Sequence, residues 1–345
     1  MKAVADNPGD HRIVAIWLLI CCALVFAMVV LGGVTRLTGS GLSMVDWRPI
    51  MGILPPLNET QWQETFALYQ QSPEFRHVNY EMDVDGFKGI FWLEYLHRLL
   101  GRTIGLVFLL PFLFFLATGR IHKRGLPKYL LMFVLGGLQG LLGWYMVKSG
   151  LVDNPHVSQY RLTAHLVAAF AIYAFMFWVA LGILFRGRDE IRHALYGATA
   201  ALTGLVTVTV ISGGFVAGLK AGLAYNTFPL MDGKWIPGGL LALEPAWRNL
   251  FDNLTTVQFN HRVLAISTLL LVIGYWAVAV RKSMARPARL AVHVLLLVAV
   301  LQVALGIATL LLAVPTTLAV THQANALVLL TTVLFLCHRL RGVTE

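Results

Sequence analysis

Residues 91–98, Phe91-Trp92-Leu93-Glu94-Tyr95-Leu96-His97-Arg98, place a carboxylate, an imidazole and a guanidinium at the start of an apolar run that ends near residue 118. Glu94 and His97 are three residues apart, so they share one face if the stretch is helical. Ionisable side chains inside a membrane span are costly, and by default they mark a functional site. This stretch alone fits a structural explanation equally well, with Glu94 at the membrane interface and His97 as a hydrogen-bonded core residue.

The composition of the whole chain indicates a membrane environment for this stretch. Of the 345 residues, 57% are hydrophobic and only 13% are charged, which is typical of a protein with several membrane spans. Apolar runs long enough to cross a bilayer cover about residues 13–35, 88–118, 128–148, 160–185, 191–217, 255–280, 287–312 and 317–340. The sequence therefore predicts an all-α integral membrane protein with eight transmembrane helices.

The net charge of +10 is a topology signal. Taken together, the two termini and the loops at 119–127, 186–192 and 281–289 carry an excess of Lys and Arg, whereas the opposite side is nearly balanced. Cytoplasmic segments of membrane proteins carry such an excess, so both termini are predicted to be cytoplasmic. Because the positive charge lies on one side of the membrane, it does not indicate nucleic-acid binding, and the expected surroundings are membrane lipids.

The longest segment between the predicted spans, about residues 43–87, lies on the outer side. Asn58 could cap a short helix that has Trp62, Phe66 and Tyr69 on one face. This pattern is typical of a helix that lies at the membrane interface. A loop of this length is more often a lid or a docking surface than a plain connection.

The two halves of the chain resemble each other. The glycine pair Gly32-Gly33 recurs 181 residues later as Gly213-Gly214. The other repeated positions are His97 and His261, Gln139 and Gln302, and His165 and His322. Each half has four spans in the same order, which predicts two pseudo-symmetric four-helix bundles, residues 1–187 and 188–345. Small residues from Gly136 to Gly143 additionally predict close helix packing in the third span.

Four of the 11 histidines lie inside the predicted spans, on the second and fourth span of each half. They are His97, His165, His261 and His322. Each lies about 8–12 Å below the outer end of its helix, at about 1.5 Å per residue. Two imidazoles that face each other across a bundle suit axial ligation of heme iron, whereas a bare zinc or copper ion usually needs three or four ligands. A di-iron carboxylate site would need a second Glu-x-x-His motif.

The two halves differ beside these histidines. Glu94 stands in the first half where Gln258 stands in the second, so only the first site can exchange a proton. This difference disfavours a di-iron site and predicts a reactive heme in the N-terminal half and an electron-transfer or structural heme in the C-terminal half. Arg98 and Arg262 follow two of the histidines, and they could either bind heme propionates or extend to the membrane interface.

Several motifs resemble those of the heme A synthase family. They are Gly32–Ser43, Glu94–Arg98, His165, Phe259–Arg262 and Thr321–Gln323. The resemblance covers the whole chain, and it implies oxidation of the C8 methyl group of heme O to the formyl group of heme A. Two successive hydroxylations would give a geminal diol that loses water, and the product would be supplied to terminal cytochrome oxidases. The implied location is a bacterial cytoplasmic (inner) membrane, with the heme sites toward its outer face.

The same resemblance implies roles for individual residues. His261 and His322 would ligate a heme b cofactor in the C-terminal half. His97 and His165 would flank the iron of the substrate heme in the N-terminal half, and Glu94 would be the catalytic carboxylate. Implied partners are heme O, an electron donor that the sequence does not identify, heme O synthase and cytochrome oxidase assembly factors.

The cysteines distinguish two branches of that family. One branch has a cysteine pair in its first outer loop, whereas the three cysteines of this chain, Cys21, Cys22 and Cys337, all lie in predicted spans. The sequence is similar to the other branch, in which a relay of electrons through outer-loop thiols is not available.

Two other functions are compatible with four membrane histidines. A bis-heme electron carrier of cytochrome b type would use both hemes without chemistry on either, and a heme-delivery partner of an oxidase would use the long outer loop for docking. Glu94 distinguishes the enzyme from the carrier, because a carrier needs no carboxylate in one half only.

Overall fold

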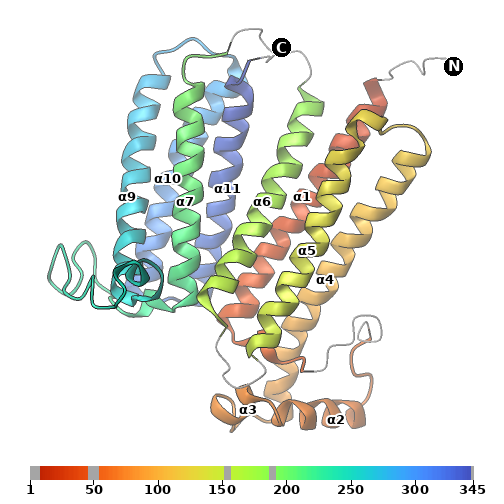
Figure 1. Ribbon diagram of the computed structural model, residues 1–345, viewed down its shortest axis with the longest axis vertical. Helices are drawn as coiled ribbons and strands as arrows, with labels where there is room; N and C mark the ends of the chain where they lie inside the picture. Colours follow the sequence, from red (N-terminus) through yellow and green to blue (C-terminus); the bar gives the residue numbers. More distant parts are fainter. Residues whose placement is uncertain (1–7, 46–53, 151–156, 186–191, 343–345) are drawn as a thin grey trace.

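The computed structural model describes residues 8–45, 54–150, 157–185 and 192–342, and its helices are shown in Figure 1. In these ranges eight helices are long and apolar enough to cross a membrane, which confirms the predicted all-α membrane fold. They are α1 (Pro8–Leu37), α4 (Val84–Ala117), α5 (Leu126–Gly150), α6 (Gln159–Leu184), α7 (Tyr196–Gly218), α9 (Leu254–Ala279), α10 (Arg286–Leu311) and α11 (Thr316–Leu340).

The eight helices form two neighbouring groups of four, as Figure 1 shows. In the first group α1 packs against α4 and α6, and α5 packs against the same two helices. In the second group α9 and α11 each pack against both α7 and α10. The groups meet where α11 contacts α1 and α6 and where α6 contacts α7. Helix α1 begins and α11 ends at the same end of the molecule, which is called the termini end below.

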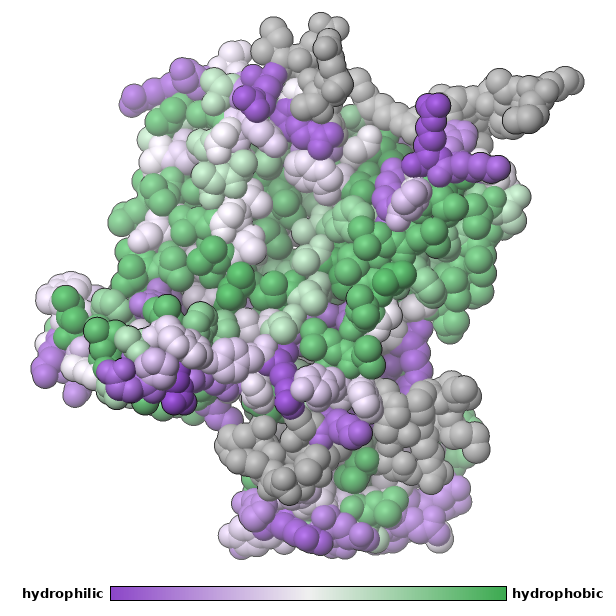
Figure 2. All heavy atoms as spheres, viewed as in Figure 1, coloured by the Kyte–Doolittle hydropathy of each residue, from purple (hydrophilic) through white to green (hydrophobic). Residues whose placement is uncertain are grey.

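The surface between the two ends is apolar, as expected for a chain surrounded by lipid. Figure 2 shows a broad hydrophobic band across the helices, with hydrophilic side chains gathered at the two ends. Large side chains on the outside of the band, such as Leu106, Leu138 and Leu270, are more than half exposed. Exposed apolar side chains at mid-helix are stable in lipid and would be costly in water.

Three polar contacts join the two groups of helices. Gln323 of α11 donates a hydrogen bond of 2.7 Å from Nε2 to the carbonyl of Val29 on α1. Tyr173 of α6 and Thr331 of α11 are hydrogen-bonded through their hydroxyl groups at 2.9 Å, and Arg36 at the end of α1 donates to the carbonyl of Ala217 on α7. Hydrogen bonds between helices in a membrane fix which faces meet, because lipid offers the polar groups no substitute partner.

Residues 57–83, which precede α4, form a compact unit at the end of α4 opposite the termini end. This unit is called the outer cap below, after the side on which the sequence places it. It contains α2 (Glu59–Gln70) and α3 (Pro73–His77). Asn58 caps α2 as predicted, because its side chain accepts a 2.9 Å hydrogen bond from the Gln61 backbone N–H. Helix α4 begins at Val84, four residues before the predicted start, because the Asp83 side chain accepts from the Gly86 N–H at 2.8 Å.

The apolar face of α2 packs on α4, so its predicted position at the membrane interface is wrong. Trp62 contacts Phe91 of α4 with ring centroids 5.0 Å apart, and Tyr69 stacks on Phe87 at 5.0 Å. These rings and Phe66 are buried in a small core of their own. The extension of α4 beyond the membrane band offers an aromatic surface, and α2 buries its own aromatic rings there.

Glu74 in the outer cap makes the stability of this unit depend on pH. Burial, partly opposed by the hydrogen bond from Tyr69, raises the pKa of the Glu74 carboxyl from 4.5 to about 7. The folded cap therefore favours the neutral acid. Its stability is highest below pH 4.5 and falls as the pH rises toward 7, by about 3 kcal/mol in total.

We expect Glu74→Gln to remove this pH dependence and to make the cap more stable at pH 8. Hydrogen exchange of residues 59–79 at pH 5.5 and pH 8, corrected for intrinsic rates, measures the effect. Glu64→Gln on the exposed side of α2 is the matched control, and it should keep the wild-type dependence. Equal protection of the wild-type cap at the two pH values would contradict the assignment.

Candidate functional site

Each of the four predicted histidines lies against a glycine of a neighbouring helix. The pairs are Gly32 with His97, Gly143 with His165, Gly213 with His261, and Gly306 with His322. A β-carbon added to any of these glycines would approach the ring to between 2.9 and 3.2 Å, which is closer than side chains normally pack. The glycines therefore provide the space in which the imidazoles lie.

The repeated glycine pairs have two separate tasks. Gly32 and Gly213 make room for histidines, whereas the next residue in each pair faces the other group of helices. A β-carbon at Gly33 would lie 3.2 Å from Gln323, and one at Gly214 would lie 2.9 Å from Thr163. The motif thus combines a histidine contact with a contact between the two halves.

The packing role predicted for the glycines of α5 is wrong for three of the four. A β-carbon at Gly136, Gly137 or Gly140 would meet no atom of a described neighbour within 4 Å. Only Gly143 makes a close contact, and its partner is the His165 ring at 2.9 Å. Gly136, Gly137 and Gly140 instead lie on exposed faces of α5 within the apolar band.

These contacts predict a strong effect of a single added methyl group. Gly306→Ala places a β-carbon 2.9 Å from Cε1 of His322, so the ring must move. We expect the variant to lose most of the heme that the sequence predicts at this histidine, measured as heme per protein after purification. Gly140→Ala adds the same methyl group in open space and should retain heme, with a helix more stable by up to about 1 kcal/mol. Full heme content in Gly306→Ala would contradict the close fit.

The C-terminal histidine pair has the spacing that one metal ion between two rings requires. The ring centroids of His261 and His322 are 6.5 Å apart and the ring planes are nearly perpendicular, at 88°. With metal–nitrogen bonds of about 2 Å, two axial imidazoles have centroids roughly 6 Å apart. Nδ1 of His261 is hydrogen-bonded to Ser212 at 2.7 Å, which orients the ring and leaves Nε2 for a ligand.

In each group, a glutamine of the third helix contacts the histidine of the fourth helix. Gln139 donates from Nε2 to the His165 carbonyl at 2.9 Å, and Gln302 donates to the His322 carbonyl at 3.2 Å. Each amide nitrogen also lies near the ring of the same histidine. Nε2 of Gln139 is 3.5 Å from Nε2 of His165, and Nε2 of Gln302 is 3.4 Å from Nε2 of His322. The glutamines predicted from the repeat therefore position the histidines, and they do so equally in both halves.

The two glutamines differ in their second contact. Asn325 donates a 2.7 Å hydrogen bond to Oε1 of Gln302. The corresponding residue of the first half is Ala168, and Oε1 of Gln139 is buried with no hydrogen-bond partner in the part of the chain that the structure describes. The C-terminal site is thus more firmly held than the N-terminal site.

Glu94 is 2% exposed and its two oxygens accept four hydrogen bonds. Oε2 accepts from the Ser43 hydroxyl and from the Met44 backbone N–H, both at 2.7 Å. Oε1 accepts from Arg98, at 2.6 Å from Nη2 and at 3.1 Å from Nε. A buried carboxylate needs such compensation, and the ion pair with Arg98 supplies the opposite charge.

Arg98 and Arg262 hold the turns that follow α1 and α7. Arg98 donates to the Met44 carbonyl at 3.0 Å, and Arg262 donates to the Tyr225 carbonyl at 2.8 Å. Met44 and Tyr225 are 181 residues apart, the same offset as the glycine pairs. Binding of heme propionates by Arg98 and Arg262 stays a prediction. Each guanidinium would have to bind the propionate in addition to, or in place of, its backbone carbonyl partner.

The carboxylate site has a neutral counterpart in the second half. Gln258 donates from Nε2 to the Tyr225 carbonyl at 3.1 Å, and its Oε1 lies 3.4 Å from Nη2 of Arg262. Residues 43 and 44 were not predicted as part of the site. The 181-residue offset of the glycine pairs also relates Met44 to Tyr225, and it would have indicated this segment. Arg98 binds the Met44 carbonyl, and Arg262 binds the Tyr225 carbonyl.

The side chains of the C-terminal pair fit the heme site that the sequence predicts there. The C-terminal rings have the required spacing, and the four glycines accommodate the rings. Nδ1 of His165 and Nδ1 of His322 are buried without a hydrogen-bond partner among the described residues, so packing against the neighbouring helix, more than hydrogen bonding of Nδ1, holds each ring. Among the same residues no group of three or more His, Cys, Asp or Glu side chains is placed to hold a bare metal ion.

Fold and site together define a multi-pass membrane protein with two histidine pairs and a buried carboxylate near one of them. Residues 15–334 match the family model described as cytochrome oxidase assembly protein. The chain is 56% identical over 332 residues to the heme A synthase of Nitrosospira multiformis, covering 95% of this chain and 93% of the relative. The heme A synthase of Nitrosomonas eutropha is 54% identical over 98% of this chain and 97% of its own length. The chain belongs to the heme A synthase family.

Proposed function

We propose that this protein oxidises the C8 methyl group of heme O to the formyl group of heme A. The observation that supports this best is the asymmetry at Glu94. A buried carboxylate, held by Ser43, Met44 and Arg98, lies three residues from His97, whereas the equivalent position of the second half is the neutral Gln258. Relatives that share about half of their residues with this chain over nearly its whole length are heme A synthases.

The C-terminal histidines are proposed to hold a heme b cofactor. His261 and His322 would ligate the iron, with Ser212 orienting the ring of His261 and Gln302 holding the backbone of His322. When bound, heme b supplies a redox centre that can pass electrons within the protein. Electron transfer requires no proton-exchanging side chain at that site, in agreement with the neutral Gln258.

The N-terminal histidines are proposed to bind the substrate. His97 and His165 would flank the iron of heme O. Two neutral imidazoles are the form that ligates iron. The ligation fixes the macrocycle, so that one edge can be presented to Glu94 in a constant orientation.

Glu94 is proposed to handle protons at the reacting carbon. Loss of water from the geminal diol requires one proton to leave the hydroxyl that becomes the formyl oxygen and another to join the hydroxyl that departs as water. A carboxylate fixed beside the methyl group can accept and return these protons. The donors around Glu94 keep both oxygens in place, and Arg98 can stabilise the ionised form each time it is regenerated.

The protein is proposed to reside in the bacterial cytoplasmic membrane, with both heme sites toward its outer face. The excess of Lys and Arg at the termini end supports this orientation. The four histidines lie toward the other end of their helices. Heme O synthase, oxidase assembly factors and an electron donor are proposed partners, and the absence of cysteines from the outer cap agrees with the branch that lacks a thiol relay.

The proposal is tested by chromatography of hemes extracted from cells that express this protein beside a source of heme O. Heme A should accumulate only when the protein is present, and an inactive chain with all four histidines replaced should give none. If heme O stays unconverted while the purified protein carries two low-spin hemes and an electron donor is supplied, the protein is an electron carrier and the enzymatic proposal is wrong.

A further inference from the structure

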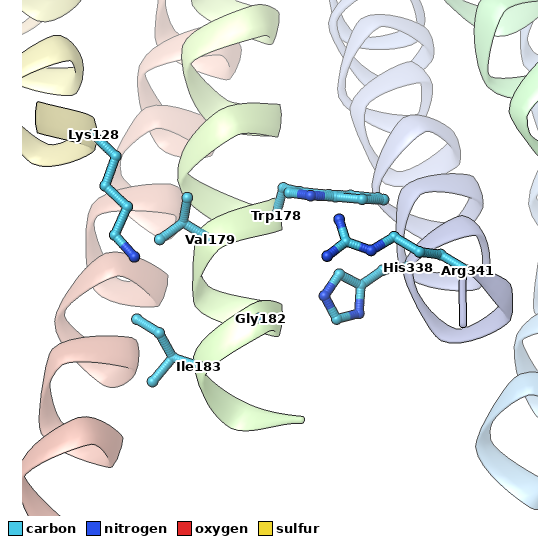
Figure 3. Close-up of a pocket in the computed structure, with 7 residues that line it drawn as sticks. All are labelled: Lys128, Trp178, Val179, Gly182, Ile183, His338 and Arg341. Atoms are coloured by element: carbon cyan, nitrogen blue, oxygen red, sulfur yellow. The ribbon is translucent and has the colours of Figure 1, made fainter. Parts of the chain in front are cut away.

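A basic cavity at the termini end lies at the junction of the two groups of helices, far from the four histidines of the candidate site. Its volume is about 220 Å³, several times the roughly 30 Å³ that one water molecule occupies in the liquid. Figure 3 shows its lining, with Lys128 of α5 on one side of α6 and His338 and Arg341 at the end of α11 on the other. Gly182 of α6 lies between Lys128 and Arg341, and it has no side chain that would separate them.

The charges that line this cavity have one sign. Lys128 and Arg341 are cationic, and no described carboxylate is among the lining residues. A second cavity of about 400 Å³ shares Lys128 and Ile183 with the first and adds Arg120 and Arg124. The two cavities thus form one basic groove, which begins beside α11 and continues to the loop between α4 and α5.

Aromatic rings hold the cationic groups of the groove in place. The guanidinium of Arg341 lies 5.2 Å from the centre of the Trp178 ring, and His338 meets the same ring edge-on at 5.0 Å. The ammonium group of Lys128 lies 5.1 Å from the centre of the Tyr129 ring. Such contacts fix a cation at the depth where membrane meets water, so the charges are positioned before any ligand arrives.

The remaining lining residues are apolar and lie on the membrane side. Val179 and Ile183 belong to the last two turns of α6, within the apolar band, and Nε of Arg341 is buried without a hydrogen-bond partner among the described residues. A ligand that fits the groove therefore has an anionic group for the cations and an aliphatic part for α6. Basic pockets between transmembrane helices on the cytoplasmic side recognise anionic lipid head groups in this way.

We propose that this groove binds the phosphodiester head group of an anionic glycerophospholipid of the leaflet at the termini end. The head group bridges Lys128 and Arg341 and so links the first group of helices to α11 of the second. The acyl chains follow Val179 and Ile183 into the membrane. The bound lipid strengthens the junction of the two groups, which otherwise depends on few polar contacts.

The test is a titration of the purified full-length protein with phosphatidylglycerol or phosphatidylcholine, with bound lipid counted by native mass spectrometry. Wild-type protein is expected to prefer phosphatidylglycerol at least tenfold. The double variant Lys128→Gln/Arg341→Gln is expected to lose this preference, with binding weakened roughly 30-fold, about fivefold for each cation. Unchanged binding of phosphatidylglycerol by the double variant would overturn the proposal.

Matched controls separate a built site from general surface charge. Arg281→Gln/Arg289→Gln removes two exposed cations from the same end of the molecule, outside the groove, and should bind phosphatidylglycerol like the wild type. Equal losses in both double variants would show a non-specific effect and overturn the proposal. If the groove variant does not fold, the single variants should each lose about fivefold, and Lys128→Arg should retain binding.

A last arm of the test distinguishes a lipid from a free anion. Inorganic phosphate added at the same concentration as phosphatidylglycerol should not displace the lipid, because it lacks the aliphatic part that contacts α6. Full displacement by inorganic phosphate would identify a free-anion site and overturn the lipid assignment.

Discussion

Glu94→Gln is expected to lower the conversion of heme O to heme A by at least about 100-fold while heme b stays bound. The amide cannot accept a proton, so the substitution removes the proposed chemistry with little change in shape. The fold already accommodates a glutamine at this place, because Gln258 contacts Arg262 and the Tyr225 carbonyl in the second half. The ratio of heme A to heme O in extracts, together with the heme b content of the purified protein, measures both expectations.

Two further variants show whether the charge of Glu94 or its packing matters. Ser43→Ala removes one 2.7 Å hydrogen bond but keeps the carboxylate and its ion pair, so a modest loss of activity is expected. Gln258→Glu in the Glu94→Gln background restores the number of carboxylates in the wrong half and should not restore conversion. Heme A formation at the wild-type rate in Glu94→Gln would show that another group handles the protons.

His261→Ala is expected to abolish the b-type absorbance of the purified protein. The ring supplies one of two proposed axial ligands, and the 6.5 Å spacing of the His261 and His322 rings leaves one metal position between them. The loss should be close to complete, since replacing an axial ligand by a methyl group leaves an open coordination position and a void beside Gly213. The reduced-minus-oxidised spectrum and the ratio of heme to protein measure it.

The assignment of the cofactor to one half is tested by comparing three variants. His322→Ala should behave like His261→Ala, whereas His97→Ala should lose heme A formation and keep the b-type spectrum. His293→Ala in α10 is a matched control, because this histidine lies away from the site and accepts a hydrogen bond from Trp276 at 3.1 Å. A normal spectrum in His261→Ala with a lost spectrum in His97→Ala would place heme b in the N-terminal half.

Much of the fold is encoded locally, so the sequence predicted it well. The eight spans follow from runs of apolar residues, and their ends agree with the structure to within a few residues except at the starts of α1, α4 and α7. The early start of α4 depends on the N-cap residue Asp83, whose side chain accepts a hydrogen bond from the Gly86 backbone N–H. The Asn58 cap of α2 and its aromatic face were likewise visible, because each involves residues within one or two helical turns.

Where the faces of helices meet depends on contacts between residues far apart in the chain. The aromatic face of α2 could have entered the membrane interface, and only the structure shows that it packs on Phe87 and Phe91 of α4. The glycines of α5 had the spacing of a packing motif, yet Gly143 alone has a neighbour, the His165 ring. Spacing along one helix describes a surface, whereas the partner of that surface is decided by the other helices.

The sequence by itself determined the four histidines, their arrangement in two repeats, and Glu94 as the residue that the second half lacks. These follow from periodicity and from the cost of ionisable groups in lipid, which are properties of the chain alone. Only the tertiary structure decided that Glu94 is bound by Ser43, Met44 and Arg98, and that each histidine occupies the space left by a glycine on another helix. A buried charge is stable only when its partners surround it, and folding brings those partners from two segments about 50 residues apart.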